Sequence, residues 1–160
     1  MKRAATVGVY GFTAEAFLAK LREAEVRQLL DVRQRRGVRG PDYSWANSRR
    51  LQTGLSQAGI DYRHHPELAP TTELRRLQYR ADERAGVGKR SRVALAPEYV
   101  ERYTRQILDR VDLGPIIEAM PQEGRAALLC VERDPAACHR WLVARSMEAD
   151  FGVEVVHLRP

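Results

Sequence analysis

Short apolar runs alternate with amphipathic segments along the chain, which is the pattern of an α/β protein. The β-rich or continuous apolar runs predict strands at residues 6–10, 27–33, 60–68, 125–132 and 153–158. Apolar residues at helical spacing predict helices after Thr13, near Leu51 and Leu55, across 71–84, after Pro97 and over about 135–150. The fourth run is nearly all apolar, as expected for a parallel strand that is covered on both faces.

Strands that alternate with helices predict a single open, mostly parallel five-stranded sheet with helices on both faces, a Rossmann-like α/β fold. With right-handed crossovers, the simplest strand order is 3-2-1-4-5. In that order the ends of the first, second and fourth strands lie side by side where the winding reverses. Ligands of open α/β sheets bind there, beyond the carboxyl ends of the strands.

The length of 160 residues suits one domain, and we expect residues 1–160 to form a single α/β domain. Arginine-rich loop and helical insertions are predicted at about 34–50 and 69–97. The net charge of +6 has its source in the middle of the chain, where residues 33–110 hold 17 Lys/Arg against 9 Asp/Glu. Arginine suits bidentate contact with phosphate or carboxylate, so polyanions are plausible partners, although a solvated basic face explains the composition equally well.

Composition also narrows the class of protein. No apolar run approaches the roughly 20 residues that cross a bilayer, and the start does not resemble a signal peptide, so we expect no membrane partner. Two cysteines are far too few for a disulfide scaffold, and a reducing cytoplasm is the expected location. The run V-G-V-Y-G-F before the first helix is not the dinucleotide fingerprint, and we expect no cofactor.

Both cysteines lie in the stretch LLCVERDPAACHRWLV, residues 128–143, and His139 follows the second. Asp134-Pro135 predicts a helix start, because aspartate is a favoured N-cap and proline is favoured at the first helical position. Cys138 then falls in the first turns of that helix, where the helix dipole favours a thiolate or a bound anion. A buried structural cysteine is the alternative, because a leucine four residues on shares its face.

Metal binding and a disulfide are weaker hypotheses for this stretch. Cys130, Cys138 and His139 are suitable ligand types, but the C-x7-C-H spacing matches no familiar zinc pattern. Neighbouring side chains at 138 and 139 would also point about 100° apart on a helix. We therefore expect no metal. A Cys130–Cys138 disulfide would need a redox role in the cytoplasm.

Three strand ends supply the expected site residues. The expected catalytic residues are Cys138 as a nucleophile or redox thiol and, as proton carriers, His139, Glu132 and Asp31. The expected ligand-binding residues are Arg140, Arg33, Gly8, Tyr10, Gly11 and Cys130. For the glycines, a tight turn between strand and helix is the simpler interpretation.

The arginine-rich middle supports a second hypothesis, because arginines interleaved with exposed aromatic rings are typical of surfaces that bind phosphates and stack bases. No sequence signature of an RNA- or DNA-binding module is present, so the signal is compositional. The candidate residues for nucleic-acid binding are Arg35, Arg36, Arg39, Trp45, Lys89, Arg90 and Arg92.

Four segments together resemble the family catalogued as domain of unknown function 488: TVGVYGF, LLDVR, GIDYRHHPELAP and, most specifically, CVERDPAACHR. The resemblance runs from about Thr6 to His157. It implies an α/β fold and a common site built from Asp31-Val32-Arg33 and the Cys-His-Arg motif, and it brings no established reaction.

Two functional hypotheses follow. The first is a cytoplasmic protein that binds, and acts as an enzyme on, a phosphate-bearing ligand such as a nucleotide or nucleic-acid end, at a Cys-His-Arg site on the carboxyl edge of the sheet. The second is a non-catalytic nucleic-acid-binding module that uses the arginine-rich middle, with structural cysteines.

Overall fold

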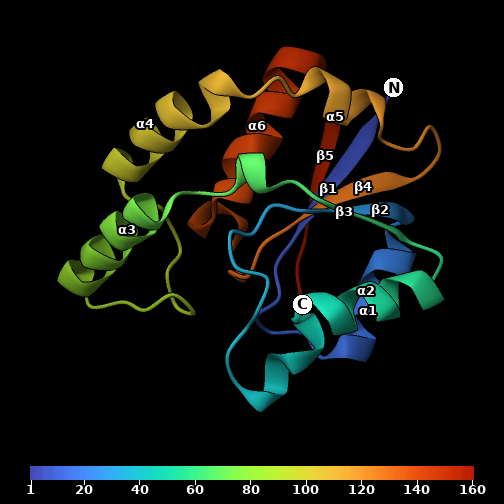
Figure 1. Ribbon diagram of the computed structural model, residues 1–160, viewed down its shortest axis with the longest axis horizontal. Coiled ribbons are helices and arrows are strands. Elements are labelled where there is room, and N and C mark those ends of the chain that lie inside the picture. The colour runs from blue at the N-terminus through green and yellow to red at the C-terminus, as the bar shows by residue number, and fades with distance from the viewer.

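Five parallel strands form a single sheet in the computed structural model, which describes residues 1–160 (Figure 1). The strands are β1 (Arg3–Val7), β2 (Val26–Asp31), β3 (Asp61–His64), β4 (Arg125–Leu129) and β5 (Glu154–Leu158). The predicted α/β class and five-stranded sheet are confirmed. The first strand begins and ends three residues before the predicted 6–10, so Gly8 and Tyr10 belong to the turn that follows it.

The predicted strand order is wrong at the centre of the sheet. The observed order is β3-β2-β4-β1-β5, so β4 lies between β2 and β1. Residues Ala126 to Leu129 are wholly buried, which suits the central position because that strand is covered on both faces. The error has a physical source: consecutive strands are neighbours only in roughly two-thirds of cases, and here the crossover from β1 to β2 leaves room for β4.

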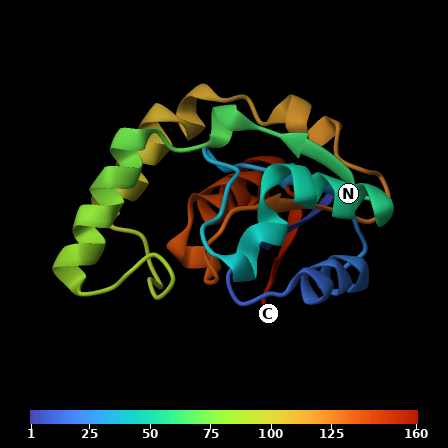
Figure 2. The ribbon, with the colours of Figure 1, turned by 60° about the horizontal axis from the view of Figure 1, so that its bottom comes forward.

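Helices cover both faces of the sheet (Figure 1). Their bounds are α1 (Ala14–Glu23), α2 (Ser48–Gln57), α3 (Thr72–Ala85), α4 (Pro97–Gln106), α5 (Gly114–Glu118) and α6 (His139–Phe151). Helix α1 packs near β2 and α2 near β3, while α6 packs on the other face over β1, β4 and β5. Helix α4 packs against α6, and α3 lies outside α4, so this pair extends beyond the sheet (Figure 2).

Local sequence explains where α1 forms. Thr13 is its N-cap, as predicted, and its hydroxyl accepts a hydrogen bond from the Ala16 amide at 3.2 Å. Phe17 and Leu21, four residues apart, form the buried face. Phe17 contacts the Trp45 ring, with 4.8 Å between ring centroids, which joins the loop after β2 to the core. One cluster of 37 buried apolar residues extends through both faces of the sheet.

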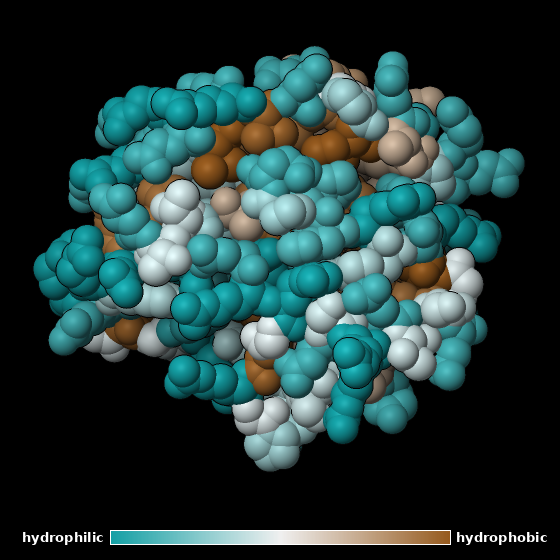
Figure 3. All heavy atoms as spheres, viewed as in Figure 1, coloured by the Kyte–Doolittle hydropathy of each residue, from teal (hydrophilic) through white to brown (hydrophobic).

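No helix of the structure is both long enough and apolar enough to cross a membrane. The face shown in Figure 3 is mostly hydrophilic, with apolar atoms gathered in a strip along its upper part.

The chain segments after β1 and β4 lie in contact at the carboxyl edge of the sheet. The Val9 and Tyr10 amides both donate to the Val131 carbonyl, at 3.1 and 3.0 Å. Gly8 permits this approach, because a Cβ atom there would lie 1.9 Å from the Glu132 carbonyl oxygen. Only a residue without a side chain at position 8 lets the backbone that follows Cys130 lie this close to the backbone that follows β1.

We predict that Gly8→Ala lowers the free energy of unfolding by about 1–3 kcal/mol, since the added methyl group forces backbone to move in a packed region. Gly54→Ala is the matched control. Its Cβ, in the interior of α2, would meet only a Leu18 methyl at 3.8 Å, so we expect a gain of about 0.5–1 kcal/mol. Urea unfolding followed by circular dichroism measures both, and equal stability of Gly8→Ala and wild type would contradict the close approach.

Candidate functional site

A pocket of about 430 Å³ lies beyond the carboxyl ends of β2 and β4, between the sheet and the α3–α4 pair. Its floor comes from the segments after β4 and before α6, and its walls come from the loop after β2, from α3 and from the loop before α4. The residues that line it are Tyr10, Arg33, Gln34, Arg35, Gly37, Val38, Arg39, Pro70, Arg75, Gln78, Tyr79, Lys89, Arg92, Leu95, Tyr99, Cys130, Val131, Glu132, Ala137, Cys138 and His139.

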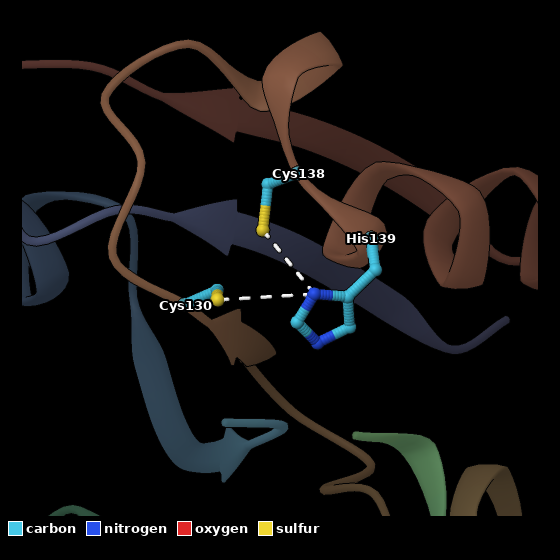
Figure 4. Close-up of side chains that lie close together, drawn as sticks. All are labelled: Cys130, Cys138 and His139. Atoms are coloured by element: carbon cyan, nitrogen blue, oxygen red, sulfur yellow. Dashed lines mark hydrogen bonds between the residues drawn. The ribbon is translucent and has the colours of Figure 1, made fainter. Parts of the chain in front are cut away.

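Two sulfur atoms and an imidazole meet on the floor of this pocket (Figure 4). The His139 Nδ1 atom lies 3.6 Å from Cys138 Sγ and 3.9 Å from Cys130 Sγ. Cys130 directly follows β4, whereas Cys138 and His139 stand at the start of α6. All three side chains are buried, and all three line the pocket.

The backbone before α6 differs from the predicted continuous helix. Asp134 does accept a hydrogen bond from the Ala136 amide, at 3.1 Å, but residues 135–137 form only a single 3-10 turn. Cys138 is extended, with φ −141° and ψ 148°, and α6 begins at His139. Because Cys138 precedes the helix, the expected 100° separation from His139 is wrong, and both side chains reach the same point.

The hydrogen bonds of His139 determine which ring nitrogen carries a proton. Nε2 lies 2.8 Å from the Val32 carbonyl oxygen, which can only accept, so Nε2 must be the donor. Nδ1, which faces the two sulfur atoms, therefore has a free lone pair when the ring is neutral. Burial lowers the pKa of His139, but Cys130, the Val32 carbonyl and Glu132 favour the charged ring and leave its pKa raised overall.

The two thiols are not equivalent. A hydrogen bond to Cys138, then burial and the charge of Cys138, raise the pKa of Cys130 to about 12, while His139 opposes the shift. Within the pair, burial and the neighbouring sulfur therefore hold the pKa of Cys130 above its ordinary value.

Arg92 links the pocket floor to α3. Its Nη2 donates to Glu132 at 2.9 Å, its Nη1 donates to Asp82, and its Nε donates to the Ala137 carbonyl at 3.1 Å. Burial raises the pKa of Glu132, as does Cys130, and Arg92 opposes that rise. The second oxygen of this carboxylate, Oε2, is buried without a partner.

Asp31 and Arg33 form a closed buried pair. Two Arg33 nitrogens donate to the Asp31 carboxylate at 2.9 and 2.8 Å, and the third donates to the Ala46 carbonyl at 2.9 Å. The Tyr62 hydroxyl also donates to Asp31. Burial lowers the pKa of Arg33, but Asp31, followed by Cys130 and Tyr62, leaves that pKa raised overall. Arg33 lines the pocket, whereas Asp31, the expected proton carrier, does not.

Arg140, expected to bind the anion, does not line the pocket. It is fully buried, and its Nη1 donates to the Glu132 carbonyl at 2.7 Å, so it holds the turn that follows β4. Gly8 lies under the same turn and is not a pocket residue. Gly11 is also outside the pocket; its amide donates to the Tyr43 hydroxyl at 3.1 Å. Of the expected residues from this first turn, Tyr10 alone reaches the pocket.

Four cations of the wall have no acidic partner. Arg35, Arg39, Arg75 and Lys89 form no salt bridge, in contrast to Arg33 and Arg92. Arg75 donates only to neutral groups, the Gln34 amide oxygen and the Tyr79 hydroxyl. Burial lowers the pKa of Lys89, but neighbouring groups, Glu132 and Tyr79 first among them, outweigh burial and leave that pKa raised. The ammonium therefore stays charged. The wall therefore carries an excess of positive charge, and Glu132 is the one acidic residue among those that line the pocket.

The other candidates for nucleic-acid binding are engaged within the fold. Trp45 packs on Phe17, and Arg36 donates to the Tyr62 hydroxyl at 3.4 Å. The Arg90 guanidinium lies 5.0 Å from the centre of the Tyr10 ring and 5.2 Å from that of Tyr43.

Tyr79 and Tyr99 line the pocket but were not expected there. Tyr99 stands four residues before Tyr103, and this helical spacing is the one sequence signal that could have drawn attention to it.

The fold and the pocket define a parallel α/β protein with a buried Cys-Cys-His cluster at the carboxyl edge of its sheet. The family described as "Domain of unknown function DUF488" matches residues 13–147, and the chain belongs to this family. Neither the curated proteins nor the solved structures contain a match. The two motifs of the family resemblance meet here, since His139 donates to the Val32 carbonyl.

We predict that Arg92→Met lowers the free energy of unfolding by about 3–5 kcal/mol, because it leaves Asp82 and Glu132 buried without their counter-charge. Arg90→Met, the exposed control two positions earlier, should cost about 0.5–1 kcal/mol through its lost cation–π contacts. Chemical denaturation compares the two. Similar losses in both variants would show that the Arg92 network contributes little.

A titration of His157 tests the buried charge of Arg140. Burial and then Arg140 lower the pKa of His157 below its ordinary 6.5. The unfolded chain therefore takes up this proton first as pH falls, and the folded state loses stability below about pH 6.5. Arg140→Met should move the His157 midpoint, followed by NMR, toward 6.5, while Arg145→Met on the exposed side of α6 should leave it in place. An unmoved midpoint in Arg140→Met would mean that Arg140 does not act on His157.

Proposed function

We propose that this protein binds a phosphate-bearing ligand, such as a nucleotide or the end of a nucleic acid, in the pocket above Cys130, Cys138 and His139. The observation that carries the proposal is the wall of four cations without acidic partners. Arginine and lysine make short, charge-assisted hydrogen bonds to phosphate oxygens, and their attraction is stronger in a partly enclosed pocket than in bulk water.

The size and lining of the pocket support a small ligand with both a charged and a flat apolar part. A volume of about 430 Å³ lies within the usual range of roughly 300–1,000 Å³ for small-molecule sites. Tyr79 and Tyr99 stand beside Leu95 on the side of α3 and α4. Tyr99 is buried and stacked on Tyr103. Tyr79, by contrast, is 37% exposed, with the Arg75 guanidinium 5.7 Å from its ring centre. An apolar part of the ligand would therefore pack beside Tyr79 while its phosphate meets the cations.

The groups that can act on such a ligand lie on the floor. Cys138, His139 and Glu132 remain the candidates for chemistry, because each lines the pocket. Arg140 supports them from behind through the Glu132 carbonyl.

A non-catalytic nucleic-acid-binding module has less support. Base stacking on that surface needs free aromatic rings, yet Trp45 packs on the core and Tyr43 is covered by Arg90. Arg92 is buried between two carboxylates. The exposed Arg35 and Arg39 remain available to a nucleic-acid strand at the mouth of the pocket.

A thermal-shift screen with mononucleotides, phosphosugars and short oligonucleotides tests the proposal, since a ligand of the folded state raises the melting temperature. Lys89→Met and Arg75→Met should each weaken the ligand that is found by about tenfold to a hundredfold, the equivalent of one charge-assisted hydrogen bond of about 1.5–3 kcal/mol. Calorimetric titration of the purified variants gives the dissociation constants.

Arg84→Met is the matched control, because it removes the same charge from the exposed end of α3, outside the pocket. It should leave the affinity nearly unchanged. Two results would contradict the pocket proposal: equal weakening in all three variants, or binding of oligonucleotides alone with an affinity that falls steeply with added salt. Either result would mean that the protein binds polyanions on its charged surface.

A further inference from the structure

The two sulfur atoms and the imidazole nitrogen of the pocket floor are arranged around one point. Cys130 Sγ, Cys138 Sγ and His139 Nδ1 all lie within 4.8 Å of one another (Figure 4). Thiolate sulfur and imidazole nitrogen are the preferred protein ligands of Zn²⁺. We propose that these three atoms bind a zinc ion, with a fourth coordination position open toward the pocket.

The spacing of the donors fits a tetrahedral zinc centre. Zinc bonds of about 2.3 Å to sulfur and about 2.0 Å to nitrogen, at a tetrahedral angle, place the two ligand atoms about 3.5 Å apart. The observed separations of Nδ1 from the two sulfur atoms are 3.6 and 3.9 Å. The same geometry places the two sulfur atoms about 3.8 Å apart. Since all three donors lie within 4.8 Å of one another, side-chain shifts of at most about 1 Å close the site around an ion.

His139 is oriented as a metal ligand. Its Nε2 donates to the Val32 carbonyl at 2.8 Å, which leaves the lone pair of Nδ1 directed at the sulfur atoms. Ligating histidines almost always donate their second ring nitrogen to a carbonyl, carboxylate or water, because that bond holds the tautomer and the ring plane. The extended Cys138 residue completes the arrangement, since it brings neighbouring residues 138 and 139 to one centre.

Charge also favours the ion. Two thiolates and one Zn²⁺ have no net charge, so the closed group suits a buried position better than a thiolate alone. A disulfide between Cys130 and Cys138 would remove the charge too, but it would leave Nδ1 of His139 facing the sulfur atoms without a bonding partner.

The position of the cluster indicates a reactive zinc site rather than a structural one. Structural zinc sites are closed by four protein ligands, whereas catalytic sites use three and leave the fourth to water or substrate. Here all three donors line the pocket, and Glu132, whose Oε2 is buried without a partner, lies on the same floor. A ligand phosphate or a water molecule can reach the open position from the cationic wall. The zinc site itself does not depend on that ligand.

Titration with Co²⁺ tests the site without any knowledge of the ligand. The full chain is purified under reducing conditions, stripped with a chelator and titrated with Co²⁺ and then with Zn²⁺. We expect one ion per chain, with the visible bands and the near-ultraviolet thiolate charge-transfer band of tetrahedral cobalt, and displacement of the cobalt by zinc. Bound zinc should protect both cysteines from alkylation.

Cys130→Ser, Cys138→Ser and His139→Gln should each weaken zinc binding by more than about 100-fold, which exceeds the cost of losing an outer-shell partner. His65→Gln is the matched control, because this histidine lies outside the pocket beside Glu67. The zinc affinity of this variant should stay at the wild-type value.

The wild-type titration decides the proposal even if a variant does not fold. Binding of less than one ion per chain, a cobalt spectrum without thiolate bands, or full affinity in a folded Cys130→Ser variant would overturn it. Each of these results can occur with the phosphate pocket intact, since Lys89→Met and Arg75→Met test that pocket separately.

Discussion

The buried guanidinium of Arg92 is the contact on which the candidate site depends. It lies between α3, through Asp82, and the floor of the sheet edge, through Glu132 and the Ala137 carbonyl. Burial of an arginine is costly unless its charge and its donors are paired, and here two carboxylates and one carbonyl from three segments are the partners. Helix α3 packs on α4, and this network joins it to the edge of the sheet, so that α3 forms a wall of the pocket.

The cations that line the pocket fall into two groups, those paired with carboxylates and those that form no salt bridge. Arg33 and Arg92 are neutralised by buried carboxylates and hold the backbone, whereas Arg35, Arg39, Arg75 and Lys89 remain free on the wall. The floor holds the opposite kind of group, two sulfur atoms and an imidazole with lone pairs directed at one point. An anionic ligand and a soft cation are therefore complementary occupants, one against the wall and one on the floor.

The predicted site and the pocket lie at the same edge of the sheet for a reason that is independent of strand order. In both orders the ends of β1, β2 and β4 are consecutive in space, and the motif residues follow those strands directly. The errors arose where residues beyond the strands decide the outcome. An extended Cys138 makes His139 a partner of both cysteines, and no periodicity in the chain indicates that conformation. The sequence predicts Arg140 as a ligand contact, whereas it lies behind the floor, where it donates to the Glu132 carbonyl beside Gly8.

The α/β class, the parallel sheet, the cap at Thr13 and the membership in a family follow from the sequence alone, because apolar periodicity, capping residues and motif letters are local properties of the chain. The central place of β4, the pairing of Arg92 with Asp82 and Glu132, and the meeting of Cys130 with His139 were decided only by the tertiary structure. Each of these depends on contacts between segments far apart in the chain. Such contacts are selected by packing and by the cost of leaving a buried charge unpaired, and neither can be read from residues taken a few at a time.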